Sequence, residues 1–167
     1  MSTYNIVEDK GVNHMGRLKD LRALVDEKLK TIDDAKRISA TVHLYGVSLA
    51  ATLIAEKRGL DQELCAMAAM LHDMHAYLSG SYDDHAHKGA KLAEEILAQL
   101  NQTTEEETAC ICSMIYHHDD KEVIDSDYDE VLKDADVIHH CFNDLSKPIK
   151  AKEQQRYDAL RAEFGLQ

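Results

Sequence analysis

The stretch AMAAMLHDM, residues 66–74, joins a run of apolar residues directly to a histidine and an aspartate. Every position from Ala66 to Leu71 is apolar, so a helix here has no polar face and is expected to be central and buried. Asp61 is placed to start this helix, and His72 and Asp73 close it. Burying a carboxylate is costly unless it is paired or bound to metal. The stretch therefore predicts a buried helix that carries a functional pair at its end.

On both sides of this stretch, apolar residues recur at steps of three and four, which is typical of amphipathic helices. We expect helices over residues 15–30, 34–58, 85–100, 104–118 and 129–142, and a charged C-terminal helix that Pro148 opens, over about 148–166. Thr104 and Glu107 have the spacing of a capping box. Sustained period-two alternation is absent, so the sequence predicts an all-α bundle.

Length and composition indicate one domain. The chain has 167 residues, of which 44% are hydrophobic and only 5% aromatic, so the core must consist of aliphatic residues and methionine. We expect a loose arm over residues 1–14 and a single domain over 15–167, with its core at about 35–142. The four cysteines show no Cys-x-x-Cys spacing, and we expect them to be reduced core residues.

The net charge of −12 argues against partners that are themselves polyanions. An acidic surface repels nucleic-acid backbones and anionic lipid headgroups. No segment approaches the roughly 18 consecutive apolar residues of a membrane span, so a cytoplasmic protein is the default expectation. A phosphate-bearing substrate would need a local positive centre, which a bound metal ion can supply.

The chain has ten histidines, and several stand at helix ends or beside apolar faces. His43 lies inside the 34–58 helix, His85 and His87 begin the next long helix, and Asp134 and Asp136 lie in the 129–142 helix. Helical proteins build internal metal sites by bringing such side chains together from several helices. Mixed imidazole and carboxylate ligands suit Fe, Mn, Co, Ni or Zn better than Ca.

The order His43, His72-Asp73, Asp136 resembles the H…HD…D signature of the HD superfamily of metal-dependent phosphohydrolases. The apolar helix that runs into His72-Asp73 is similar to the one in that family, and so is the Lys-Asp-Ala-Asp context of Asp136. The resemblance covers roughly residues 35–142. It implies a five-helix core in which His43, His72, Asp73 and Asp136 hold a first divalent metal.

Two further histidines resemble those of the two-metal subgroup, which includes the symmetric dinucleoside tetraphosphate hydrolases. His85 precedes Gly89-Ala90, as in the subgroup's His-x-x-x-Gly-Ala, and His118 stands three residues after Ile115. The resemblance thus implies one or two metals per chain. One position departs from the subgroup: a lysine usually follows the HD aspartate by three residues, and Ala76 stands there.

The resemblance also implies roles in catalysis. A metal-activated water would attack phosphorus, with Asp73 bridging the metals and orienting the nucleophile. Lys88 would contact phosphate, with Lys91 and Lys121 as secondary contacts, and His75 would protonate the leaving oxygen. The expected substrate is a small phosphorylated metabolite such as a nucleotide, with Tyr77, Tyr82, Tyr116 or Tyr128 near the pocket rim.

Other readings stay open at this point. The chain could be a non-catalytic HD module that binds a nucleotide or metal, or an HD-fold di-iron oxygenase, and a homodimer is possible. His117 and His87 are expected to have supporting or surface roles, with metal ligation as the alternative for each. Asp134 is expected to be a cap, to support a neighbour or to be solvated. His14, His139 and His140 are expected to be structural. The acidic residues of 119–129 are interpreted as a solvated, mobile loop that borders the site, because they lack the order of an EF-hand.

Overall fold

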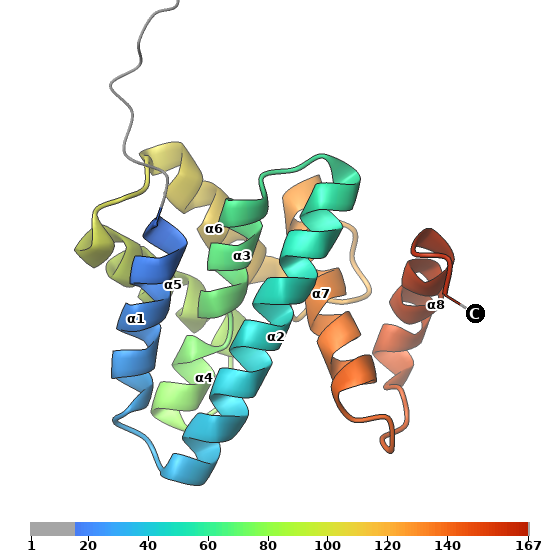
Figure 1. Ribbon diagram of the computed structural model, residues 1–167, viewed down its shortest axis with the longest axis horizontal. Helices are drawn as coiled ribbons and strands as arrows, with labels where there is room; N and C mark the ends of the chain where they lie inside the picture. Colours follow the sequence, from blue (N-terminus) through green and yellow to red (C-terminus); the bar gives the residue numbers. More distant parts are fainter. Residues whose placement is uncertain (1–15, 167) are drawn as a thin grey trace, which may run out of the picture.

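The computed structural model describes residues 16–166, which are built from helices and contain no strand (Figure 1). The all-α prediction is therefore confirmed. Residues 1–14, including His14, lie outside the described part, so the predicted arm and domain limits stay predictions. The helices are α1 (Arg17–Leu29), α2 (Asp34–Arg58), α3 (Gln62–Leu71), α4 (Met74–Ser79), α5 (His85–Leu100), α6 (Glu105–His117), α7 (Asp127–Asn143) and α8 (Gln154–Glu163), with a 3₁₀ turn, η1 (Ala151–Glu153), before α8.

Local capping signals mark several of these helix ends. The carboxylate of Asp33 accepts hydrogen bonds from the first turn of α2, and Gly59 ends that helix in the left-handed conformation with φ 70°. A glycine pays no steric penalty there. Thr104 and Glu107 form the expected capping box of α6.

Two stretches differ from the sequence prediction. The helix that carries AMAAMLHDM stops at Leu71, and a short helix, α4, follows after His72 and Asp73. The predicted start of the last helix at Pro148 is wrong, because Pro148 lies in a loop and α8 begins at Gln154. A proline is tolerated in a helix's first turn but equally in the loop before it, so its position alone could not decide.

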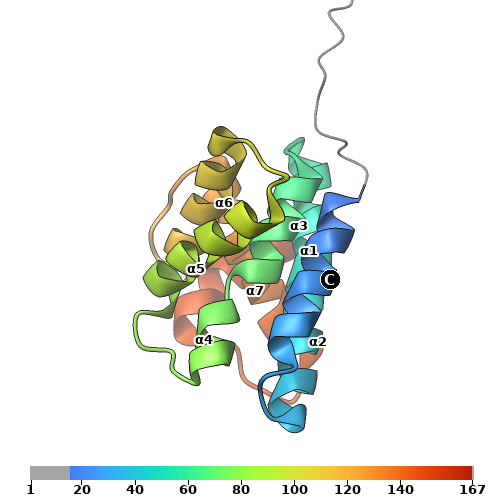
Figure 2. The same cartoon turned by 90° about the vertical axis from the view of Figure 1, so that its left-hand side faces the viewer.

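α3 is the centre of the bundle. All of its residues from Leu64 to Leu71 are buried, and it packs against α1, α2, α6 and α7. In Figure 2, α1 and α2 lie on one side of α3 and α5 and α6 on the other. The break after Leu71 therefore places His72 and Asp73 deep between several helices.

α2 is long and apolar enough to cross a membrane by length and composition alone, with a mean hydropathy of 1.6 over 18 residues. Half of that window is buried inside the bundle, as in the core helix of many folded domains. The four cysteines are free thiols, and burial raises the pKa of Cys65 to about 12 and that of Cys112 to about 11. Both are therefore protonated and unreactive at neutral pH.

Candidate metal centre

Side chains from three parts of the fold form a first donor cluster at the break after α3. His43 comes from α2, His72 and Asp73 from the turn between α3 and α4, and Asp136 from α7. His43 Nε2 lies 3.0 Å from His72 Nε2, 3.4 Å from Asp73 Oδ2 and 3.5 Å from Asp136 Oδ1. The structure thus brings together the four residues that the resemblance implied for a first metal.

A second cluster shares Asp73. His85, the first residue of α5, and His118, just after α6, place their Nε2 atoms 3.5 and 3.4 Å from Asp73 Oδ1 and 3.2 Å from each other. Asp73 Oδ2 thus faces the first cluster, and Asp73 Oδ1 faces the second. Asp73 would therefore offer one oxygen to an ion in each cluster.

The hydrogen bonds of the imidazoles indicate which ring nitrogen carries the proton and which keeps a lone pair that can bind metal. His72 Nδ1 donates to the Ala69 carbonyl, His85 Nδ1 to that of Tyr82 and His118 Nδ1 to that of Ile115. A neutral imidazole carries one N–H, so each Nε2 presents a lone pair. Burial also lowers the pKa of His72 to about 3, which keeps it neutral. Lone pairs that face one another at 3.0–3.2 Å repel unless a cation lies between them.

Two buried carboxylate oxygens support the same conclusion. Asp73 Oδ1 and Asp136 Oδ1 have no hydrogen-bond partner among the described residues. Leaving such atoms unpaired is costly. Donor atoms that share one ion at bonds of about 2.1 Å stand roughly 3.0–3.4 Å apart in octahedral or tetrahedral geometry, close to the spacings above. The residues present therefore fit one or two divalent transition metals.

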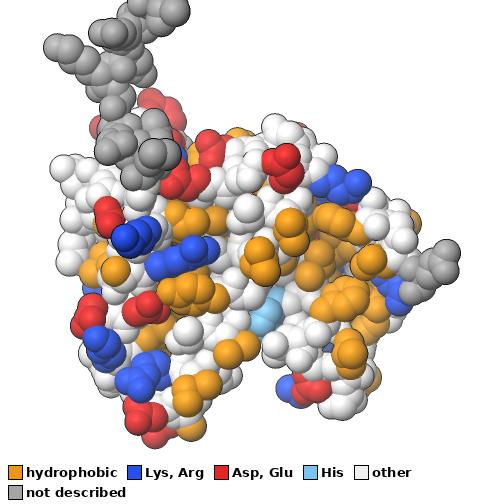
Figure 3. Space-filling view, viewed as in Figure 1, with side chains coloured by type: hydrophobic (Ala, Val, Ile, Leu, Met, Phe, Trp, Pro, Cys, Tyr) orange, Lys and Arg blue, Asp and Glu red, His pale blue; other side chains and the backbone are white. Residues whose placement is uncertain are grey.

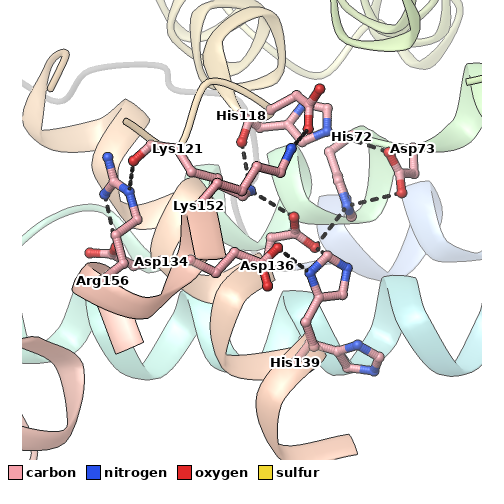
Figure 4. Close-up of polar contacts among 12 residues, drawn as sticks. His72, Asp73, His118, Lys121, Asp134, Asp136, His139, Lys152 and Arg156 are labelled. Carbon is pink, nitrogen blue, oxygen red and sulfur yellow. Dashed lines mark hydrogen bonds and ion pairs between the residues drawn. The ribbon is translucent and has the colours of Figure 1, made fainter. Parts of the chain in front are cut away.

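The remaining oxygen of Asp136 is held by a lysine. Lys121 Nζ lies 2.7 Å from Asp136 Oδ2 and also donates to the His118 carbonyl, and the lysine is buried (Figure 4). Burial alone would raise the pKa of Asp136, but the Lys121 ammonium lowers it well below its usual range. Lys121 was expected to contact phosphate. The structure instead uses it to hold a ligand carboxylate.

His139 and His140, interpreted from the sequence as structural, both line the site. His139 Nδ1 lies 3.0 Å from His43 Nδ1. Burial lowers the pKa of His139 to about 4, so it is neutral and its free nitrogen can accept the His43 N–H. This turns His43 Nε2 toward the first cluster.

His140 belongs to a third group of donors, with His43 and Asp136. Its Nε2 lies 3.3 Å from Asp136 Oδ1, and its Nδ1 lies 3.0 Å from Oε1 of Glu153, a buried residue of η1. The sequence carries a signal for His140, because it stands four residues after Asp136 on one face of a helix. No local pattern points to Glu153.

The clusters lie at the floor of a cavity of about 540 Å³. Its wall includes Tyr77 and Tyr82, whose hydroxyls stay protonated because burial raises the pKa of each. Asp119 and the loop after α7, with Lys147 and Lys150, complete the rim. The cavity is large enough for a small metabolite. Tyr116 and Tyr128 do not line it.

Two residues predicted to act in catalysis are not brought to this cavity. Lys88 is half-buried, and its Nζ contacts the backbone and carboxylate of Asp83 rather than the cavity. His75 is half-buried, and its Nδ1 has no partner among the described residues, but it is not part of the cavity wall. Lys91 is exposed and likewise absent from the wall.

The alternative ligands lie elsewhere. His118 faces Asp73, whereas Nδ1 of His117 donates to the Ser113 carbonyl. His87 is exposed beside Asp84 and stacks on Tyr116. Asp134 is neither a cap nor solvated, since it is buried between Arg58 and Arg156.

Several side chains of the acidic segment 119–129 form ion pairs or hydrogen bonds within the fold, so the segment is not fully solvated. Asp125 pairs with Lys133, which is fully buried, and Asp129 caps α7 together with Ser126. Asp119 reaches the cavity and pairs with Lys152. The segment does border the site, as expected.

A model of the HD domain family matches residues 41–140, more than half of the chain and the whole span from before His43 to His140. The chain belongs to the HD domain family. Members of this family bind divalent metals, in agreement with the donor clusters described above. No curated protein matches the chain.

Among solved structures, the chain is similar to a crystal structure of a predicted HD superfamily hydrolase from an uncultured Thermotogales bacterium. The two are 26% identical and superpose with a TM-score of 0.59, over 89% of this HD protein and 88% of the other. The shared architecture thus extends over nearly the whole described bundle.

Proposed function

We propose that this HD protein is a metal-dependent phosphohydrolase that cleaves a phosphoester or phosphoanhydride of a small, nucleotide-like metabolite. The observation that carries the proposal is Asp73, whose two oxygens face two separate donor clusters at the floor of one cavity. The similarity to a predicted HD superfamily hydrolase supports the same reaction class.

The two donor clusters would supply most of the groups that the proposed hydrolysis requires. Divalent metals held by His43, His72, Asp73 and Asp136, and by Asp73, His85 and His118, would lower the pKa of a bound water and attract phosphate oxygens. Asp73 lies between the two clusters, so its carboxylate can orient a water toward the cavity. Lys121 and His139 keep Asp136 and His43 turned toward the centre.

The cavity and charge support a small phosphorylated substrate. The net charge of −12 disfavours a polymeric nucleic acid. Lys147 and Lys150 place ammonium groups at the cavity rim, where they pair with Asp144 and Glu153. Tyr77 and Tyr82 offer aromatic surface and hydroxyl groups for a base or sugar. A dinucleoside tetraphosphate is one candidate, although Ala76 departs from that subgroup.

The test combines metal analysis with a substrate screen. We expect about two metal ions per chain in protein purified without chelator, and loss of both in Asp73→Ala because that carboxylate serves both clusters. His85→Ala should lose one ion. His87→Ala, two residues along the same helix but paired with Asp84, should keep both.

The same proteins are then assayed for phosphate release from nucleotides and dinucleoside polyphosphates with added Mn²⁺ or Fe²⁺. Hydrolysis by the wild type and by His87→Ala, but not by Asp73→Ala, supports the proposal. One ion per chain would remove His85 and His118 from the ligand set. Metal binding without hydrolysis of any phosphate substrate would favour a non-catalytic HD module.

A further inference from the structure

α2 exposes an uncharged face that no described segment covers. Ile38, Val42, Leu49 and Leu53 are between 49% and 64% exposed. Successive helical residues are turned by about 100°, which places these four side chains in one stripe about 60° wide. No Asp, Glu, Lys or Arg stands between Arg37 and Glu56, although 30% of the whole chain is charged. We call this stripe the α2 seam.

The seam is more than a set of scattered surface residues. A helix rises about 1.5 Å per residue, so the seam is roughly 22 Å long. Figure 3 shows hydrophobic side chains gathered over α2 and beside the hollow between α2 and α8. That hollow has a volume of about 530 Å³, and its wall includes Leu49, Leu53, Phe142 and Leu166. Continuous apolar surface of this kind marks an interaction site.

The seam is symmetric about its own midpoint, between Tyr45 and Gly46. Ile38 and Leu53 are equally far from that point, and so are Val42 and Leu49. Two such helices crossing antiparallel about a two-fold axis would pair Ile38 with Leu53 of the other copy. A surface that is complementary to itself is what a two-fold dimer requires.

The charged ends of α2 are complementary in the same register. Asp34 at the start of the helix is as far from the midpoint as Lys57 near its end, and both are exposed. The antiparallel arrangement therefore places opposite charges together at both ends of the seam.

We propose that this protein forms a two-fold homodimer in which the α2 seams of two copies pack antiparallel. The partner's α2 occupies the hollow beside α8. The contact buries apolar side chains that would otherwise face water and leaves the metal clusters of each copy intact. This proposal rests on the surface of α2 and does not depend on the proposed reaction.

The register is tested with complementary charges in the full-length protein. Sedimentation velocity over a wide concentration range should give twice the chain mass of 18.8 kDa for the wild type. Ile38→Asp alone and Leu53→Lys alone should each sediment as monomers, because each places two charges against apolar partners. An equimolar mixture of the two variants should restore the dimer, since one copy's aspartate then meets the other's lysine.

Ile124→Asp is the matched control, because Ile124 is 83% exposed but lies far along the chain from α2. It should remain dimeric. Helix content and melting temperature confirm that each monomeric variant is folded. A wild type that is monomeric at high concentration overturns the proposal, and binding of that monomer to neutral phospholipid vesicles would identify a lipid surface as the occupant. A mixture that stays monomeric also overturns the proposed register.

Discussion

At the scale of single residues, Gly46 controls how closely His139 can approach α2. A Cβ at this position would lie 2.2 Å from His139 Cδ2 and 2.6 Å from Nε2, so the imidazole would have to move. His139 in turn holds Nδ1 of His43. The glycine thus influences the position of His43, a candidate metal ligand, without touching it.

Gly46→Ala is therefore expected to weaken metal binding by about tenfold or more, which is the usual effect of losing a partner of a ligating histidine. In the presence of chelator, the free energy of unfolding of Gly46→Ala should be close to that of the wild type. Alanine favours helix, and only the end of the His139 side chain is displaced. Titration with Mn²⁺ measures the metal affinity, and urea unfolding in chelator measures the stability.

Gly59→Ala is the control for this prediction. Gly59 has φ 70° and nothing within 4 Å of the position a Cβ would take, so an alanine there costs about 1 kcal/mol of stability through backbone strain. It should leave the manganese affinity unchanged. Equal metal affinity of Gly46→Ala and wild type would show that His139 does not position His43.

At the scale of elements, α8 packs Leu160 into the core and is further attached by several ion pairs. Arg156 on α8 contacts Glu130 and Asp134 of α7, and Arg58 of α2 contacts Glu163. Burial would raise the pKa of Glu130, but Arg156 lowers it below the ordinary 4.5, and the hydrogen bond from Arg58 lowers that of Glu163. Carboxyls with depressed pKa values stabilise the folded state above pH 4.5 and lose this effect as pH falls through their folded pKa values.

We therefore expect α8 to loosen before the rest of the bundle when the pH falls below about 4.5. Hydrogen exchange, corrected for its intrinsic pH dependence, should lose protection in α8 while α3 stays protected. Arg156→Gln should show the same loosening already at neutral pH. Loss of protection in α3 and α8 together would mean that the ion pairs do not attach α8 separately.

At the scale of the whole molecule, the metal centre joins elements that are distant in sequence. The donor side chains come from α2, the turn after α3, α5, the end of α6, and α7. An ion bound there holds these elements to one another, and it binds the folded state alone. Metal binding should therefore stabilise the entire bundle.

Removing the metal is expected to lower the melting temperature of the wild type by roughly 5–10 °C, if metal is present at about 100 times its dissociation constant. Differential scanning calorimetry with and without chelator measures this shift. Asp73→Ala should melt at the same temperature in both conditions. A wild type that is insensitive to chelator would contradict the link between metal and fold.

The sequence by itself determined the helices and much of the site. Capping residues and apolar periodicity are local signals, so the Thr104–Glu107 box placed the start of α6 correctly. The buried run 66–71 placed His72 and Asp73 inside the bundle. The resemblance to HD proteins supplied the other donors, which the fold then brought together.

Only the tertiary structure decided which neighbouring side chains face the centre. His117 and His118 differ by about 100° around a helix, and the packing of α6 against the bundle turns His118, not His117, toward Asp73. Packing also decided the position of Lys121, which was expected to contact phosphate but is buried against Asp136. It likewise brought His139 of α7 and Glu153 of η1 to the site. Periodicity along a chain tells which residues share one face of a helix. The distance and rotation between two helices depend on packing across the core, which no local pattern encodes.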